Sequence, residues 1–181
     1  MASMHSTEGI ILKKEPYGEA DLLITILTKD FGKIKVMAQG VRKETAKLKG
    51  HLEPLTHSAI SFVIGKNFYR LTSAEAKNFF IGLKGSLDKL RFVFYIINLI
   101  DFNAFEEKGD GRLFDLTRST FEKLDTIDEE NKDELAKLFF EFNAGFLHIF
   151  GLLPSQNVGE GSVKTILAKH LGAGYDIMGL T

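Results

Sequence analysis

The chain has 181 residues, of which 44% are hydrophobic and 11% aromatic, so it can bury a substantial core and is not an intrinsically disordered chain. It contains no cysteine, which excludes disulfide bonds, thiol nucleophiles and cysteine-ligated zinc. The net charge is only −1, but residues 1–80 carry 12 Lys and Arg against 8 Asp and Glu, whereas residues 81–181 carry 11 against 16. This asymmetry is a hint of an anionic partner for the first half.

The first 80 residues predict five short strands, which span residues 9–14, 20–28, 33–38, 58–65 and 68–76. Gly18 and Gly32 mark the first two turns, and Gly65-Lys66-Asn67 predicts a short hairpin between the last two strands. Residues 39–54, with two glycines and a proline, predict a linker. Five strands without a long helix among them predict a small barrel or a curled sheet.

Residues 81–181 predict helices. The segment 86–107 is apolar nearly all round, which is typical of a helix at the centre of a bundle, and Gly109 is the expected end of that helix. Further helices are expected over 112–124, from Asn131 to Gly151 and over 162–172, the second of them opened by the capping-box pair Asn131 and Glu134. We therefore expect an α+β chain, with strands over 1–80 and an all-α domain over 81–181.

The sequence shows no recognisable catalytic or phosphate-binding motif. The five histidines lack metal-ligand spacing, the glycine pairs at 109–112 and 172–174 lack a strand–loop–helix context, and neither a GxSxG nor a P-loop pattern occurs. No segment approaches the roughly 20 apolar residues that a membrane span needs. We expect no enzyme activity, no metal, no cofactor and no membrane partner.

Positive charge concentrates in residues 32–50, where six of nineteen residues are basic: Lys33, Lys35, Arg42, Lys43, Lys47 and Lys49. Strand alternation places Lys33 and Lys35 about 7 Å apart on one face. Such a row fits the phosphates of a nucleic acid, and the nearby aromatic residues are candidate platforms for unstacked bases: Tyr17, Phe31, Phe68 and Tyr69, with Arg70 beside them. Charge alone equally allows an ordinary solvated surface, with the aromatic residues filling the barrel. For Phe31 and Phe68 a place in the core is the favoured interpretation.

Residues 8–75 resemble the start of the RecO family of bacterial recombination and repair proteins. The matching motifs, in chain order, are YGEAD (17–21), GK (32–33), KLKG (47–50), LEP (52–54) and YRL (69–71). Residues 138–154, LFFEFNAGFLHIFGLLP, are similar to the helix that precedes the family's last module. The resemblance implies an N-terminal five-stranded OB-fold barrel, over 1–80, followed by the helical domain.

The resemblance also implies a function. Members of the family are non-enzymatic mediators that bind single- and double-stranded DNA and anneal complementary strands, including strands coated by the single-stranded DNA-binding protein. With RecR they help to load RecA, so RecA is an indirect partner, and the protein is expected in the cytoplasm, associated with the nucleoid. The residues implied to hold phosphates are Lys33, Lys35, Arg42, Lys43, Lys47, Lys49 and Arg70.

One feature departs from the family pattern. Many members carry a four-cysteine zinc module after the helix that ends FGLLP, but here SQNVGEGSVKTILAKHL follows and no cysteine exists. We therefore expect no zinc, which leaves RecR binding open. The alternative function is a protein-interaction adaptor in which the OB-fold serves only as a scaffold, because OB-folds also bind proteins.

Overall fold

The computed structural model describes residues 3–43, 46–104, 109, 111–153 and 159–171. The chain divides into two compact units, the first made of Met1–Phe80 with Ala104–Phe114 and the second of Ile81–Asn103 with Asp115–Thr181. Gly109 accordingly lies against Asp30 in the first unit. The assignment of residues 1–80 and 81–181 to separate domains stays a prediction.

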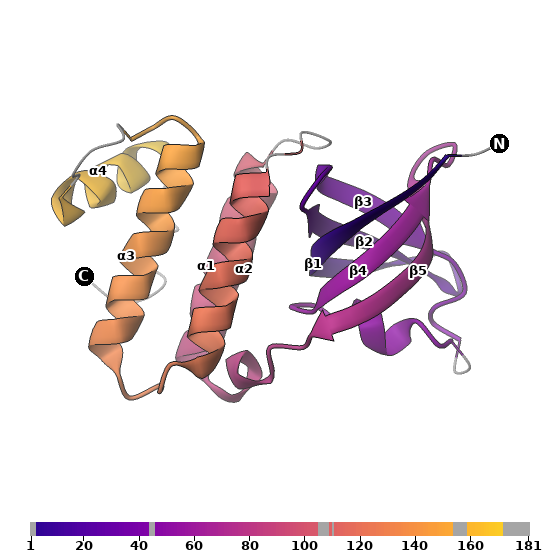
Figure 1. The fold of residues 1–181 in the computed structure, drawn as a ribbon, viewed down its shortest axis with the longest axis horizontal. Helices are drawn as coiled ribbons and strands as arrows, with labels where there is room; N and C mark the ends of the chain where they lie inside the picture. The colour runs from indigo at the N-terminus through magenta and orange to yellow at the C-terminus, as the bar shows by residue number, and fades with distance from the viewer. Residues whose placement is uncertain (1–2, 44–45, 105–108, 110, 154–158, 172–181) are drawn as a thin grey trace. The chain divides into compact units, whose positions relative to one another are not determined.

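The first unit is a closed five-stranded barrel in the order β1-β2-β3-β5-β4 (Figure 1). Its strands are β1 (Met4–Tyr17), β2 (Asp21–Thr28), β3 (Gly32–Ala38), β4 (His57–Val63) and β5 (Tyr69–Asn78). β1 pairs with β4 through its first half and with β2 through its second half, bending at a bulge between Ile11 and Lys13. β3 and β5 close the barrel as a parallel pair. This topology confirms the predicted OB-type barrel.

Alternate strand residues fill the barrel with a core that includes Ile24, Val36 and Phe62. Val41 and Leu52 join this core, although both lie in the stretch predicted to be a linker. Leu52 ends η1, a short 3-10 helix over Lys49–Leu52. The linker prediction was therefore wrong in part, because two apolar side chains anchor this basic segment to the barrel.

A polar network joins three strands of the barrel. Glu8 on β1 accepts a hydrogen bond from Lys77 on β5 and binds the His57 Nε2 atom on β4 at 3.1 Å. The hydrogen bond from Lys77 is the main reason that the pKa of Glu8 lies below its ordinary value of 4.5, and His57 adds to the effect. The Glu8 carboxylate therefore stabilises the barrel in its charged form.

Glu8→Gln is expected to lower the free energy of unfolding at neutral pH by about 1 kcal/mol. Because the folded-state pKa is depressed, this stabilisation is present above the unfolded pKa and is lost as the pH falls through the folded value. Urea denaturation of wild type and variant at neutral pH and near pH 3 measures the difference, which should shrink in acid. The exposed Glu75 supplies the control, since Glu75→Gln should cost little at either pH; an equal cost would contradict the role of the network.

The second unit contains η2 (Ile81–Gly85), α1 (Leu87–Asn103), most of α2 (Gly111–Thr126), α3 (Lys132–Ile149) and α4 (Glu160–Leu171). α1, α2 and α3 run alongside one another (Figure 1). Phe92 on α1 packs against Phe139 on α3 with ring centroids 5.1 Å apart, and the Tyr95 hydroxyl lies 2.5 Å from the Asn143 side-chain oxygen. The hydrogen bond from Tyr95 to Asn143 satisfies two buried polar groups in an otherwise apolar interface.

The predicted helix ends were mostly correct. The Asn131 side chain accepts a hydrogen bond from the Glu134 backbone, which confirms the predicted cap of α3, and Gly151 follows that helix with a φ of 70°. α1 ends at Asn103 and not near Glu107, so Gly109 does not terminate it. α4 begins two residues before its predicted start, and its predicted C-cap, Gly172, lies outside the described residues.

The helix over 86–107 was expected at the centre of a bundle, but α1 is buried on one face only. Its inner face is buried, but Leu87 and Phe94 are 66% and 57% exposed. None of the helices that the structure describes is both long enough and apolar enough to cross a bilayer.

Candidate nucleic-acid interface

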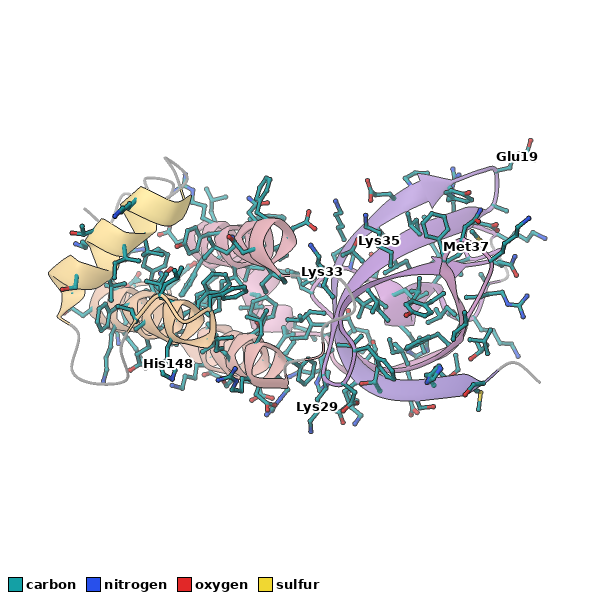
Figure 2. The ribbon with its side chains drawn as sticks, turned by 90° about the horizontal axis from the view of Figure 1, so that it is seen from above. Glu19, Lys29, Lys33, Lys35, Met37 and His148 are labelled. Carbon is teal, nitrogen blue, oxygen red and sulfur yellow. The ribbon has the colours of Figure 1, made fainter. Side chains whose placement is uncertain are left out.

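The two lysines of β3 differ in accessibility. Ile34 and Val36 point into the barrel core, so Lys33, Lys35 and Met37 occupy its outer face, in succession along the strand (Figure 2). Lys35 is half-buried, but Lys33 is only 6% exposed, so the expectation that both lie on a solvated face was wrong for Lys33. Gly109, far along the chain, lies against the turn that precedes β3, where an added Cβ would overlap the Asp30 carbonyl oxygen.

A cleft of about 410 Å³ opens where β3 extends beyond the start of β5. Between β3 and β5 only the residue pairs Val36–Tyr69 and Met37–Arg70 form. The part of β3 that precedes Val36 is therefore separated from the β4–β5 hairpin. The cleft is lined by Ile34, Lys35, Ile64, Gly65, Lys66, Asn67, Phe68 and Tyr69. It combines two cations with aromatic and amide groups, the types of side chain that hold single-stranded nucleic acid.

The aromatic candidates divide into two groups. Phe31 and Tyr69 pack on Phe62, with ring centroids 5.2 and 5.0 Å away, and so belong mainly to the barrel core. Phe68 instead lines the cleft, contrary to the core position that the sequence favoured, and meets the ring of Tyr17 edge-on at 5.7 Å. Tyr17 is 42% exposed, so part of this ring pair is open to a ligand.

The segment after β3 carries the other predicted cations, and we call Arg42, Lys43, Lys47 and Lys49 the basic loop. Its start is fastened to the β1–β2 turn, since Arg42 donates a side-chain hydrogen bond to the Gly18 carbonyl oxygen at 3.1 Å and a backbone one to Ala20 at 2.9 Å. Gly18 adopts a φ of 61°, which favours glycine at this turn. The basic loop is therefore a positioned part of the barrel surface.

All four side chains of the basic loop are exposed. Within the part of the chain that the structure describes, Lys43, Lys47 and Lys49 form no ion pair. By contrast, Lys14 is held by Glu53 at 2.6 Å and Lys132 by Asp88 at 2.6 Å. Lys43, Lys47 and Lys49 are thus exposed, and no acidic partner for them lies among the described residues.

The start of the basic loop is linked to the cleft through the β1–β2 turn. Arg42 touches Gly18, the adjacent Tyr17 touches Phe68, and Phe68 lines the cleft beside Lys35. Arg70, also exposed, pairs with Met37 and so shares the outer face of Lys35. Six of the seven predicted basic residues are therefore accessible or partly accessible, and Lys33 is the exception.

Lys66 was missed by sequence reasoning. It stands alone in the hairpin Gly65-Lys66-Asn67, outside the basic stretch, and is exposed at the cleft. A Cβ at Gly65 would overlap the Phe68 carbonyl oxygen, so the glycine fixes the tight loop that presents Lys66. An OB-type barrel closes through a parallel contact between β3 and β5, which brings this hairpin beside β3. The expected barrel topology was therefore the signal that could have identified Lys66.

The closed five-stranded barrel and the helices that follow it define a chain with an N-terminal OB-type barrel and a helical C-terminal part. The family model described as "Recombination protein O N terminal" matches residues 1–80, and "Recombination protein O C terminal" matches residues 84–170. The chain belongs to the RecO family.

Similar curated proteins carry the name DNA repair protein RecO. One from Dehalococcoides mccartyi strain BAV1 is 37% identical over 137 residues, which cover 76% of this chain and 53% of the relative. One from Syntrophus aciditrophicus is 34% identical over 153 residues, covering 83% of this chain and 57% of that protein. The chain thus spans about half the length of the curated relatives that it matches.

A metal site is the remaining question that the family raises. Among the described residues, no group of three or more His, Asp and Glu side chains is placed to hold a metal ion. The interface described above consists of cations, aromatic rings and an amide, which suit phosphates and bases and not a metal ion.

Proposed function

We propose that this chain binds single-stranded DNA along the basic loop and the cleft, and acts in DNA repair and recombination as a mediator. The observation that carries the proposal is the chain of contacts from Arg42, at the start of the basic loop, through the β1–β2 turn and the Tyr17–Phe68 ring pair to the cleft that Lys35 and Lys66 line. Lysines hold phosphates at any sequence, and open ring surfaces accept unstacked bases.

Such a surface supports strand annealing. Two complementary strands that are neutralised by cations repel each other less, and weak contacts without base reading allow the strands to search for their register. The relatives named DNA repair protein RecO support a role in DNA repair. Double-stranded DNA is the second substrate, held by the same lysines through its phosphates.

The proposed partners are the single-stranded DNA-binding protein, RecR and, indirectly, RecA. The role requires no catalysis, only binding and release of strands, so we propose a non-enzymatic protein of the cytoplasm that associates with the nucleoid. The seven residues Lys33, Lys35, Arg42, Lys43, Lys47, Lys49 and Arg70 stay the proposed DNA-binding set, with Lys66 added and with Lys33 the least accessible.

An annealing assay tests this function. Complementary strands that carry a fluorophore and a quencher are mixed with wild type and with a Lys43→Gln, Lys66→Gln variant. Wild type is expected to accelerate annealing, and the variant to return the rate toward the spontaneous one. Lys29→Gln serves as the control, because Lys29 is exposed at the opposite end of β2 from the turn that holds the basic loop. No acceleration by wild type contradicts the proposed function.

The ring pair should distinguish single from double strands. Tyr17→Ala is expected to weaken single-stranded binding by about 1–3 kcal/mol, the contribution of one stacked base, and to leave duplex affinity nearly unchanged. Fluorescence anisotropy with matched single- and double-stranded oligonucleotides measures both. Phe79→Ala is the control, since Phe79 is equally exposed, at 42%, but lies beyond the end of β5. Equal losses on both substrates would mean that Tyr17 contacts no base.

A further inference from the structure

The cleft between β3 and the β4–β5 hairpin has the size of a site for one small molecule. Its volume is about 410 Å³, and pockets that hold small molecules range over roughly 300–1,000 Å³. A single nucleotide is a ligand of this class, whereas a base pair comprises two nucleotides and a longer strand several. The cleft therefore has room for one nucleotide of a strand that passes over the barrel.

The charges of the cleft suit a ligand with an anion at each end. Lys35 on β3 and Lys66 in the β4–β5 hairpin line its two sides, and none of the eight residues that line it is acidic. Lys66 is exposed and forms no ion pair within the described part of the chain. Each nucleotide inside a strand has one phosphate on its 5′ side and another on its 3′ side. Such a nucleotide therefore matches two cations that are separated by a gap.

The groups beside the lysines suit a base. Ile64, which is 62% exposed, and the half-buried Phe68 offer apolar surface for the flat face of a base. The Asn67 side chain makes no hydrogen bond within the described residues, and its amide can both donate and accept. The edge of a base carries donors and acceptors side by side, so an amide is a fitting partner for it. The cleft thus contains a partner for each chemical part of a nucleotide.

We propose that the cleft holds one unpaired nucleotide, with its two phosphates on Lys35 and Lys66 and the edge of its base on Asn67. This nucleotide site rests on the proposed function, because it belongs to the same interface for single-stranded DNA. A base whose edge contacts Asn67 cannot use that edge to pair with a complementary base. Annealing therefore displaces the nucleotide from the cleft, whereas the phosphates of the new duplex stay accessible to the basic loop.

Thymidine 3′,5′-bisphosphate is the probe that tests this site, because it has one base between two phosphates. In NMR spectra of the isotope-labelled chain, its addition should shift the amide signals of residues 64–69 in a saturable way and those of residues 42–49 little. Lys66→Gln is expected to weaken its binding about tenfold, the effect of losing one charge-assisted hydrogen bond. Lys43→Gln is the matched control, since Lys43 is an exposed lysine outside the cleft, and it should leave the binding unchanged.

The outcomes separate the nucleotide site from the proposed function. A single-stranded oligonucleotide is titrated in parallel. If the oligonucleotide binds but the bisphosphate leaves residues 64–69 unshifted, or shifts the basic loop equally, the nucleotide site is overturned and DNA binding stands. If the oligonucleotide itself does not bind, the proposed function fails and the nucleotide site fails with it.

A second test concerns the contact between Asn67 and the base. Asn67→Ala should weaken the binding of a thymidine oligonucleotide about fivefold, because one hydrogen bond to a base is lost. An abasic strand of the same length has the same phosphates but no base edge, so its affinity should not change, and neither should that of a duplex. Fluorescence anisotropy measures all three affinities. An equal loss on the abasic strand would overturn the contact with a base, since the substitution would then act through the shape of the hairpin.

Discussion

Reversing three charges of the interface, in the variant Lys35→Glu, Lys43→Glu, Lys66→Glu, is expected to weaken binding to a single-stranded oligonucleotide at least a hundredfold at low salt. Each substitution removes the attraction of a lysine for about one phosphate, and each glutamate introduced repels the phosphates beside it. The three positions sample the basic loop and both sides of the cleft. Fluorescence anisotropy with a labelled oligonucleotide measures the change in affinity.

The control must match the change in net charge. Lys29→Glu, Lys137→Glu, Lys169→Glu reverses three exposed lysines that lie outside the basic loop and the cleft. If affinity depends only on the total charge, both variants should weaken binding equally. If the interface is local, the control should keep most of the wild-type affinity, and circular dichroism should show both variants folded.

Phe62→Ala is expected to destabilise the barrel by about 3–5 kcal/mol, the usual cost of removing a large aromatic side chain from a core. Phe62 is fully buried, and its ring packs against those of His5, Phe31 and Tyr69. These neighbours come from three different parts of the barrel, so the cavity cannot be filled by a simple local shift.

Hydrogen exchange measured by mass spectrometry can assign this destabilisation to the barrel peptides. Phe68→Ala is the matched control, because Phe68 is only partly buried at the cleft and should cost much less. An equal effect of the two substitutions would contradict the assignment of Phe62 to the core and Phe68 to the interface.

Much of the fold could be predicted from the sequence. Alternation at Ile34 and Val36 identified the inner face of β3, and the Asn131–Glu134 pair identified the start of α3. Both signals are local, because they depend on residues a few positions apart. The matching motifs of the first 75 residues pointed to the right family.

What the sequence could not predict depends on packing between distant segments. Lys33 has the alternation of an exposed residue, but it is buried at an end of the barrel to which the chain returns near Gly109. Lys66 reaches the interface only because β5 closes the barrel against β3. The exposure of Phe94 likewise depends on which faces of α1 the other helices cover, and periodicity does not record this.

The most direct test of DNA binding by the basic loop and the cleft is the salt dependence of the affinity for a single strand. For single strands the logarithm of the affinity falls with the logarithm of salt by about 0.7 for each phosphate neutralised. We predict a steep slope for wild type and a slope smaller by about 2 for the Lys35→Glu, Lys43→Glu, Lys66→Glu variant. An unchanged slope in that folded variant would contradict the proposal, since the basic loop and the cleft would then hold no phosphates.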